Sequence, residues 1–125
     1  MKRVLVVDDD AGIREVARLS LEVVGGWTVS LAEGGADAIE EAKLQPPDVI
    51  LLDVMMPGID GVETLQRLSH DPNTTHIPVI FLTAMAQTGE RRRLEATSAV
   101  GLIAKPFDPL TLGKSIETIL SGTLP

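Results

Sequence analysis

The chain has 125 residues, enough for one domain with a buried core, and 44% of them are hydrophobic. That share excludes an intrinsically disordered chain, which could not bury enough apolar surface to offset the entropy lost on folding. The formal net charge of -7 argues against direct binding of nucleic acid, because contacts to phosphates need a positive surface. The sequence contains no cysteine, which excludes disulfides and thiolate chemistry and is compatible with the reducing cytoplasm.

No segment of the sequence has the pattern of a signal peptide or a membrane anchor. The apolar residues 4–7 follow Lys2 and Arg3, but they are too few for a signal peptide, and three aspartates follow directly. No apolar run approaches the roughly 18 residues that a membrane-spanning helix needs. We therefore expect a cytoplasmic protein that forms one domain over residues 1–125 and has no membrane partner.

In the first half of the chain, short apolar runs alternate with amphipathic stretches. The pattern predicts, in order, a strand over residues 4–7, a helix over 13–24, a strand over 27–31, a helix over 36–44 and a strand over 49–52. Gly25 and Gly26 end the first helix, and the second helix stops before Pro46 and Pro47. The first and third strands contain no polar residue, so we expect them to be buried on both faces.

The second half of the chain continues this alternation. It predicts, in order, a helix over residues 60–68, a strand over 79–82, a helix over 90–97, a strand over 102–104 and a helix over 110–120. Asp60 is placed to cap the third helix. Strand–helix units in such a succession favour an α/β fold, in which a parallel sheet carries helices on both faces and the crossovers are right-handed.

Polar residues directly follow most of the predicted strands. Asp8 and Asp9 follow the first strand, Asp53 the third, Thr83 the fourth and Lys105 the fifth. In an open parallel sheet, ligands bind at the carboxyl ends of the strands, near the point where the strand order reverses. We therefore expect these carboxylates, the hydroxyl and the ammonium to converge in one shallow pocket.

The chemistry of this set favours a magnesium-dependent phosphoryl acceptor. Clustered carboxylates repel one another, and a hard divalent cation with oxygen ligands relieves that repulsion. The set contains no histidine or cysteine, which argues against zinc. Phosphoryl transfer depends on positioning and on neutralising the phosphoryl oxygens, which Mg²⁺, Lys105 and Thr83 can do. Asp53 is then the natural nucleophile, and an aspartyl-phosphate is the expected product.

Each of these residues also has a structural alternative when it is taken alone. An aspartate at a strand end is usually a turn former or a helix cap, which is the favoured interpretation of Asp10 and an open one for Asp8 and Asp9. Lys105 alone is most often a solvated charge, and Thr83 alone can cap the helix that follows. The functional interpretation depends on the whole set occupying strand ends in one chain.

Together, these segments resemble the receiver domain of bacterial two-component response regulators. The similarity is carried by residues 4–10, 51–61, 81–84 and 105–107, and it extends over essentially the whole chain. It implies a (βα)5 flavodoxin-like fold with strand order 2-1-3-4-5 and a cis peptide bond before Pro106. A protein of this kind is a signalling switch rather than a turnover enzyme.

The resemblance also implies roles for the residues at the strand ends. The implied holders of Mg²⁺ are Asp8, acting through water, Asp9, Asp53 and the main-chain carbonyl of Met55. Asp53 would accept the phosphoryl group from a histidine kinase or a histidine phosphotransfer protein, and Lys105 and Thr83 would contact that group. The output partner stays open: the chain docks to an unidentified partner, passes the phosphoryl group on, or is a fragment of a longer regulator.

One position departs from the family's pattern. Members often carry Tyr or Phe three residues before the lysine, where this chain has Leu102, and the chain contains no tyrosine. We therefore expect Thr83 to move toward a bound phosphoryl group while the face of the fifth strand changes less.

Several other residues have two open interpretations. Met55 and Met85 lie two residues after the acceptor and the threonine, and neither can orient an attacking water by a strong hydrogen bond. They therefore indicate either slow self-dephosphorylation or simple gap-filling cover. Residues 91–93 are arginines, which form either a docking patch or, more often, a solvated helix face. His70 and His76 are interpreted as surface residues.

The sequence weighs against three other classes of function. A phosphatase with an aspartate nucleophile needs a second aspartate two residues later, where this chain has Met55. A nucleotide or flavin binder needs a loop rich in Gly, Ser or Thr after the first strand, and residues 9–12 are acidic instead. A module used only for docking would not need the complete acidic set.

Overall fold

The structure is a computed structural model that describes residues 2–84 and 88–122. Strands and helices alternate along these residues: β1 (Arg3–Val7), α1 (Ala11–Leu19), η1 (Ser20–Val24), β2 (Thr28–Ala32), α2 (Gly35–Leu44), β3 (Val49–Asp53), α3 (Gly61–His70), β4 (Val79–Thr83), α4 (Thr88–Glu95), β5 (Gly101–Ala104) and α5 (Leu112–Leu120). The segment η1 is a π-helical continuation of α1.

The strands form one parallel sheet in the order β2-β1-β3-β4-β5. Strand β1 pairs with β2 on one side and with β3 on the other, so the strand order reverses beside β1. This arrangement confirms the predicted α/β fold and its strand order. It also fixes the place of a ligand site, because such sites lie beyond the carboxyl ends of the strands at this reversal.

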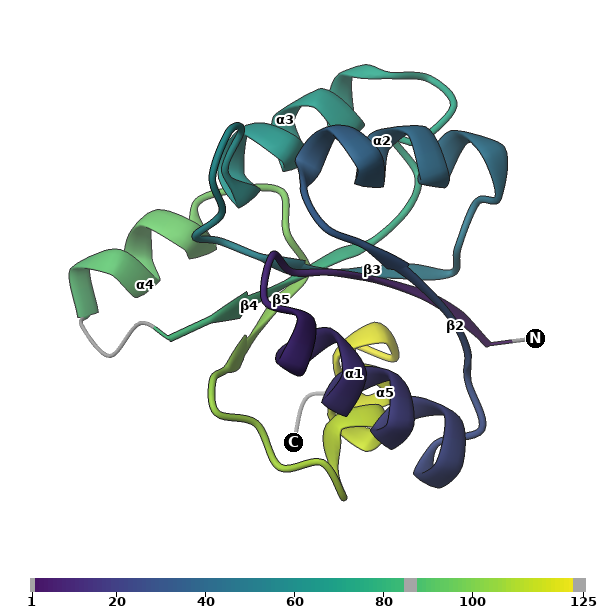
Figure 1. Cartoon of the computed structure of the whole chain (residues 1–125). Helices are drawn as coiled ribbons and strands as arrows, with labels where there is room; N and C mark the ends of the chain where they lie inside the picture. The colour runs from purple at the N-terminus through teal and green to yellow at the C-terminus, as the bar shows by residue number, and fades with distance from the viewer. Residues whose placement is uncertain (1, 85–87, 123–125) are drawn as a thin grey trace.

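Helices cover both faces of the sheet. In Figure 1, α2 and α3 lie above the sheet and α1 and α5 lie below it, while α4 extends at the side of β4. Buried Leu94 of α4 joins the core on the α2–α3 face. Within the part of the chain that the structure describes, none of the helices has the length and apolarity needed to cross a bilayer.

The inner strands are apolar because each of their faces packs on a layer of helices. Along β1, Leu5 and Val7 belong to the core between the sheet and the helices α2 and α3. Val4 and Val6 belong to the core on the other face, between the sheet and the helices α1 and α5. All four side chains are buried. Successive side chains of a strand point to opposite faces, so a strand covered on both sides has no polar position.

The first helix differs from the prediction of one regular α-helix over residues 13–24. It changes to π-helical geometry at Ser20, whose hydroxyl donates a hydrogen bond to the carbonyl of Pro109 near the start of α5. The main-chain N–H of Trp27 donates to the Leu21 carbonyl at 2.9 Å. The first contact joins residues 89 positions apart, and the second closes the end of the helix through the main chain, so the apolar pattern predicts neither.

The last helix begins later than the predicted residue 110. A turn precedes it, in which a side-chain oxygen of Asp108 accepts the N–H of Leu110 at 2.9 Å and the Asp108 carbonyl accepts the N–H of Thr111 at 3.1 Å. Leu110 is accordingly exposed and α5 starts at Leu112. The predicted helix over residues 90–97 is also displaced, and α4 spans Thr88–Glu95.

Lys2, the residue directly before β1, joins the start of this strand to α5. Its ammonium lies 5.2 Å from the ring centroid of buried Trp27 and donates to the Gly25 carbonyl at 2.8 Å. The same ammonium pairs with Glu117 at 2.6 Å. A cation over an indole face is attracted by the ring's quadrupole, so these contacts connect the start of β1 with the helical layer below it.

Candidate functional site

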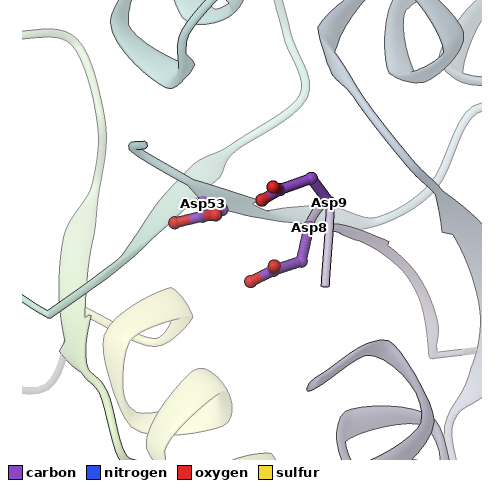
Figure 2. Close-up of side chains that lie close together, drawn as sticks. All are labelled: Asp8, Asp9 and Asp53. Carbon is purple, nitrogen blue, oxygen red and sulfur yellow. The ribbon is translucent and has the colours of Figure 1, made fainter. Parts of the chain in front are cut away.

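The carboxyl ends of β1 and β3 bring three aspartates together. Asp8 and Asp9 directly follow β1, and Asp53 is the last residue of β3. The two strands are paired up to Val7 and Leu52, so the residues that follow lie side by side. One carboxylate oxygen of each aspartate lies within 4.8 Å of those of the other two, and Figure 2 shows the side chains gathered at this edge. The structure therefore brings together the carboxylates that the sequence predicts to converge.

Lys105 completes this cluster from the end of β5. Its ammonium lies 2.7 Å from Asp8 Oδ2 and 3.1 Å from Asp53 Oδ1, and its side chain is only 15% exposed. Its main-chain N–H donates to the Thr83 carbonyl at 2.8 Å, which places it beyond the end of β4. The following bond to Pro106 is cis, as the resemblance implies. The interpretation of Lys105 as a solvated charge is therefore wrong.

Asp8 is held through its polar atoms. Its N–H donates to the Ala32 carbonyl at 3.2 Å, and its Oδ1 accepts the N–H of Asp10 at 2.9 Å. Its Oδ2 is buried and lies 2.7 Å from the Lys105 ammonium. The Lys105 ammonium is thus the positive charge that compensates this buried oxygen.

Asp10 has the structural role that the sequence favours. Its Oδ1 accepts the N–H groups of Gly12 at 2.8 Å and Ile13 at 3.2 Å, so it caps α1. These are donors that the first turn of a helix leaves unpaired. Because Asp10 fills this role, the cap interpretation is wrong for Asp8 and Asp9.

Asp53 and Met55 interact through the main chain. The N–H of Met55 donates to Asp53 Oδ1 at 3.3 Å, while the Met55 side chain is 77% exposed. The interpretation of Met55 as gap-filling cover is therefore wrong. Met85 lies outside the described residues, and slow self-dephosphorylation stays a prediction.

Thr83 ends the neighbouring strand β4 and is buried. Asp53 pairs with Leu82 in the sheet, so Thr83 lies one position beyond it at the same edge. Leu102 pairs with Phe81 and packs partly buried against the α2–α3 core. The expected movement of Thr83 and the smaller change at Leu102 concern a phosphorylated state and stay predictions.

The charges in this pocket are not balanced. Burial raises the pKa of Asp53, and the nearby charge of Asp8 raises it further, while Lys105 and the Met55 N–H act in the opposite direction. Burial opposes the charge of Lys105, but its hydrogen bonds to Asp8 and Asp53 outweigh burial and raise the pKa of Lys105. One ammonium thus leaves the carboxylates under-neutralised, and the all-oxygen donor set fits an additional hard cation such as Mg²⁺.

We expect Asp53→Asn to stabilise the protein in magnesium-free buffer at neutral pH, by about 1 kcal/mol. A carboxyl whose pKa is raised by folding contributes stability below its unfolded-state pKa, and this contribution is lost as the pH rises through the folded-state pKa. The stability gained by Asp53→Asn should therefore increase as the pH rises from the unfolded-state pKa of Asp53 through its raised folded-state pKa. Thermal unfolding of both proteins at a series of pH values measures it. An equal or lower stability of Asp53→Asn at pH 7 would contradict the unbalanced charge.

The remaining sequence predictions concern the surface. Residues 91–93 are exposed on α4, where Arg91 pairs with Glu95 at 3.1 Å and Arg93 pairs with Glu90 at 2.6 Å. These pairs lie within the helix, which agrees with a solvated helix face. His70 and His76 are both exposed, as predicted.

A family model described as "Response regulator receiver domain" matches residues 4–117. The chain belongs to this family. The resemblance in the strand-end motifs is thereby confirmed, and the protein is a receiver domain of two-component signalling. Its members are generally signalling domains that interact with histidine kinases.

The receiver domain is similar to both short and long regulators. It is 35% identical over 123 residues to "Protein PilH" of Pseudomonas aeruginosa, with 98% of this chain and 100% of PilH covered. It is 36% identical over 117 residues to "Response regulator Rre1" of Synechocystis, with 94% of this chain but 51% of Rre1 covered. It is 40% identical over 119 residues to "Response regulator PleD" of Caulobacter vibrioides, with 94% of this chain and 26% of PleD covered. The chain thus spans about half of Rre1 and about a quarter of PleD.

Solved structures agree with the fold of this receiver domain. The chemotaxis protein CheY4 of Vibrio cholerae superposes with a TM-score of 0.87 at 31% identity, covering 95% of this chain and 98% of CheY4. The N-terminal domain of a response regulator receiver protein from Methanoculleus marisnigri gives 0.78 at 38% identity, covering 97% and 98%. Both comparisons agree with the fold described above, a parallel sheet in the order β2-β1-β3-β4-β5.

One residue beside the cluster escapes prediction from the sequence. The guanidinium of Arg14, in the first half of α1, donates from Nη1 to the main-chain carbonyl of Asp8 at 2.7 Å. In the sequence, Arg14 is one charge among several on an amphipathic helix, and nothing local indicates that it reaches back to the end of β1.

Proposed function

We propose that this receiver domain accepts a phosphoryl group on Asp53 from the phosphohistidine of a histidine kinase or a histidine phosphotransfer protein, in a reaction that depends on Mg²⁺. The phosphorylated form then changes how the domain binds an output partner. One observation carries the proposal: Asp8, Asp9 and Asp53 converge at the reversal of strand order, and Lys105 bridges Asp8 and Asp53 there.

The proposed metal site uses only oxygen donors. Asp9, Asp53, the Met55 carbonyl and, through water, Asp8 would hold Mg²⁺. Bound there, the ion neutralises the carboxylates and the oxygens of the transferring phosphoryl group. The fit is supported by the convergence of three carboxylates beside a single ammonium and by the pKa of Asp53, which burial and the charge of Asp8 raise.

Asp53 is the acceptor that the topology favours. Strand β3 lies between β1 and β4, so a group on Asp53 is within reach of residues that follow both neighbours. Asp8 is held by contacts to its polar atoms, and Asp9 is exposed. Only the central position allows Lys105 and Thr83 to approach a phosphoryl group together.

In the proposed step, a carboxylate oxygen of Asp53 attacks the phosphorus of the phosphohistidine. The new oxygen–phosphorus bond forms as the nitrogen–phosphorus bond breaks, and the imidazole leaves with the electron pair. The Lys105 ammonium, already 3.1 Å from Asp53 Oδ1, neutralises one phosphoryl oxygen. The hydroxyl of Thr83 donates to another. The burial of Asp53 limits access of water to the acyl phosphate.

The output of this domain follows from a change in binding rather than from turnover. The added dianion would bias a two-state element that includes Thr83 and α4, and the surface offered to a partner would change with it. We propose a cytoplasmic partner or an attached output domain, without direct contact of this domain to nucleic acid or membrane.

Phosphorylation in vitro tests the proposal. Incubation with Mg²⁺ and acetyl phosphate should add one phosphoryl group to the protein, as measured by intact mass. Asp53→Ala should abolish the gain in mass, and a chelator should do the same. Asp37→Ala, which removes an exposed aspartate of α2, is the matched control and should leave the gain intact. Equal labelling of Asp53→Ala and wild type would contradict the assignment of Asp53.

A further inference from the structure

Arg14 contacts the acidic loop in a way that its neighbour on the same helix does not. Its guanidinium is half-buried and donates to the carbonyl of Asp8, the first residue after β1. Arg18, one turn further along α1, instead pairs with the carboxylates of Glu15 and Glu22. The Asp8 carbonyl lies beyond the last paired residue of β1, so Arg14 supplies a donor where the sheet no longer does.

The contact matters because of what it does to Asp9. Two peptide units flank Asp9, and each is held by one hydrogen bond. The carbonyl of the preceding unit accepts from Arg14 at 2.7 Å, and the N–H of the following unit, that of Asp10, donates to Asp8 Oδ1 at 2.9 Å. Asp9 itself is exposed, so the direction of its carboxylate depends on these two units.

We propose that Arg14 is a positioning residue for the metal site, which orients Asp9 by fixing the Asp8–Asp9 peptide unit. The inference rests on the proposed Mg²⁺ site and adds to it a residue that touches neither the metal nor the phosphoryl group. Partners that orient a metal ligand typically change metal affinity by about 10-fold to 100-fold when they are removed. A rigid guanidinium anchored in the first half of a helix suits this task.

The first measurement is the dissociation constant of Mg²⁺ by calorimetry, without a phosphodonor. Arg14→Ala should weaken Mg²⁺ binding by about 10-fold, because Asp9 loses its fixed orientation. Arg14→Lys can still donate one hydrogen bond to the carbonyl and should stay within about 3-fold of wild type. Arg18→Ala is the matched control on the same helix and should bind Mg²⁺ like wild type.

A second measurement needs no metal and separates positioning from general stability. In magnesium-free protein, the amides of Asp9 and Asp10 should exchange with solvent about 10-fold faster in Arg14→Ala than in Arg18→Ala, while amides of β3 keep equal rates. Arg14→Lys keeps this comparison possible if Arg14→Ala does not fold. In that case, amide exchange in Arg14→Lys close to wild type supports positioning through the carbonyl.

The outcomes distinguish the two proposals. If Arg14→Ala matches Arg18→Ala in both Mg²⁺ affinity and amide exchange, Arg14 does not position the loop and the inference is overturned. If Arg14→Ala shows faster exchange but wild type shows no binding of Mg²⁺, the proposed function fails, and with it the role of Arg14 toward a metal. Wild-type binding that Arg14→Ala weakens and Arg14→Lys largely restores supports both.

Discussion

Gly61→Ala should destabilise the protein by about 3 kcal/mol, as measured by urea unfolding. Gly61 begins α3, and its N–H donates to the Val54 carbonyl at 2.9 Å. A Cβ atom at this position would lie 2.8 Å from the Val54 Cα and closer still to the carbonyl oxygen of Asp53. These are main-chain atoms at the end of β3, so no side chain can move aside and either α3 or the acceptor strand must shift.

The same substitution should slow phosphorylation of Asp53, because the strand end that carries the carboxylate is displaced. Gly89→Ala provides the control: Gly89 lies in α4, and a Cβ there would meet no atom of the described residues within 4 Å. That change should stabilise the protein by about 0.5–1 kcal/mol, as alanine does at exposed helix positions. If Gly61→Ala has the same free energy of unfolding as wild type, α3 can move away from the end of β3 without loss of stability, and the prediction is wrong.

Lys105→Ala should slow phosphorylation of Asp53 by acetyl phosphate by about 100-fold, the effect of removing one charged donor from a transition state. The ammonium contacts both Asp8 and Asp53, at 2.7 Å and 3.1 Å, and is the cation that pairs with Asp53 among the described residues. Intact mass against time gives the rate. Lys114→Ala, which removes an exposed lysine of α5, should leave the rate unchanged.

Binding of Mg²⁺ should respond to Lys105→Ala in the opposite direction. The lysine competes with the metal for the same carboxylates, so its removal should leave Mg²⁺ affinity unchanged or increase it. A loss of rate without a loss of Mg²⁺ affinity separates neutralisation of the phosphoryl group from assembly of the site. Phosphorylation at the wild-type rate in Lys105→Ala would refute the proposed role of the ammonium.

Much of the site could be predicted because its residues lie at strand ends. The runs before Asp8 and Asp53 contain no polar position, which fixes both as buried parallel strands, and topology alone then brings their ends together. Asp60 was predictable in the same local way: its carboxylate accepts the N–H of Glu63 at 2.9 Å and caps α3.

The features that could not be predicted depend on contacts that are set by the three-dimensional path of the chain. The π-helical turn at Ser20 is accompanied by a hydrogen bond to Pro109, and Arg14 is turned toward the Asp8 carbonyl by the path of the chain between β1 and α1. Neither contact leaves a periodic signal in the sequence. The start of α5 was misplaced for a different, local reason: the side chain of Asp108 accepts the N–H of Leu110 and so favours a turn over the first turn of a helix.

The bridge from Lys105 to Asp8 and Asp53 has a consequence for folding. It joins Asp8, Asp53 and Lys105, which are far apart in the sequence, so the closure of long loops must precede it. A nascent or partly denatured copy therefore has individual aspartates but no acceptor pocket. If this pocket is the phosphoryl acceptor that we propose, a copy in which β5 is not in place would not become phosphorylated and would not signal.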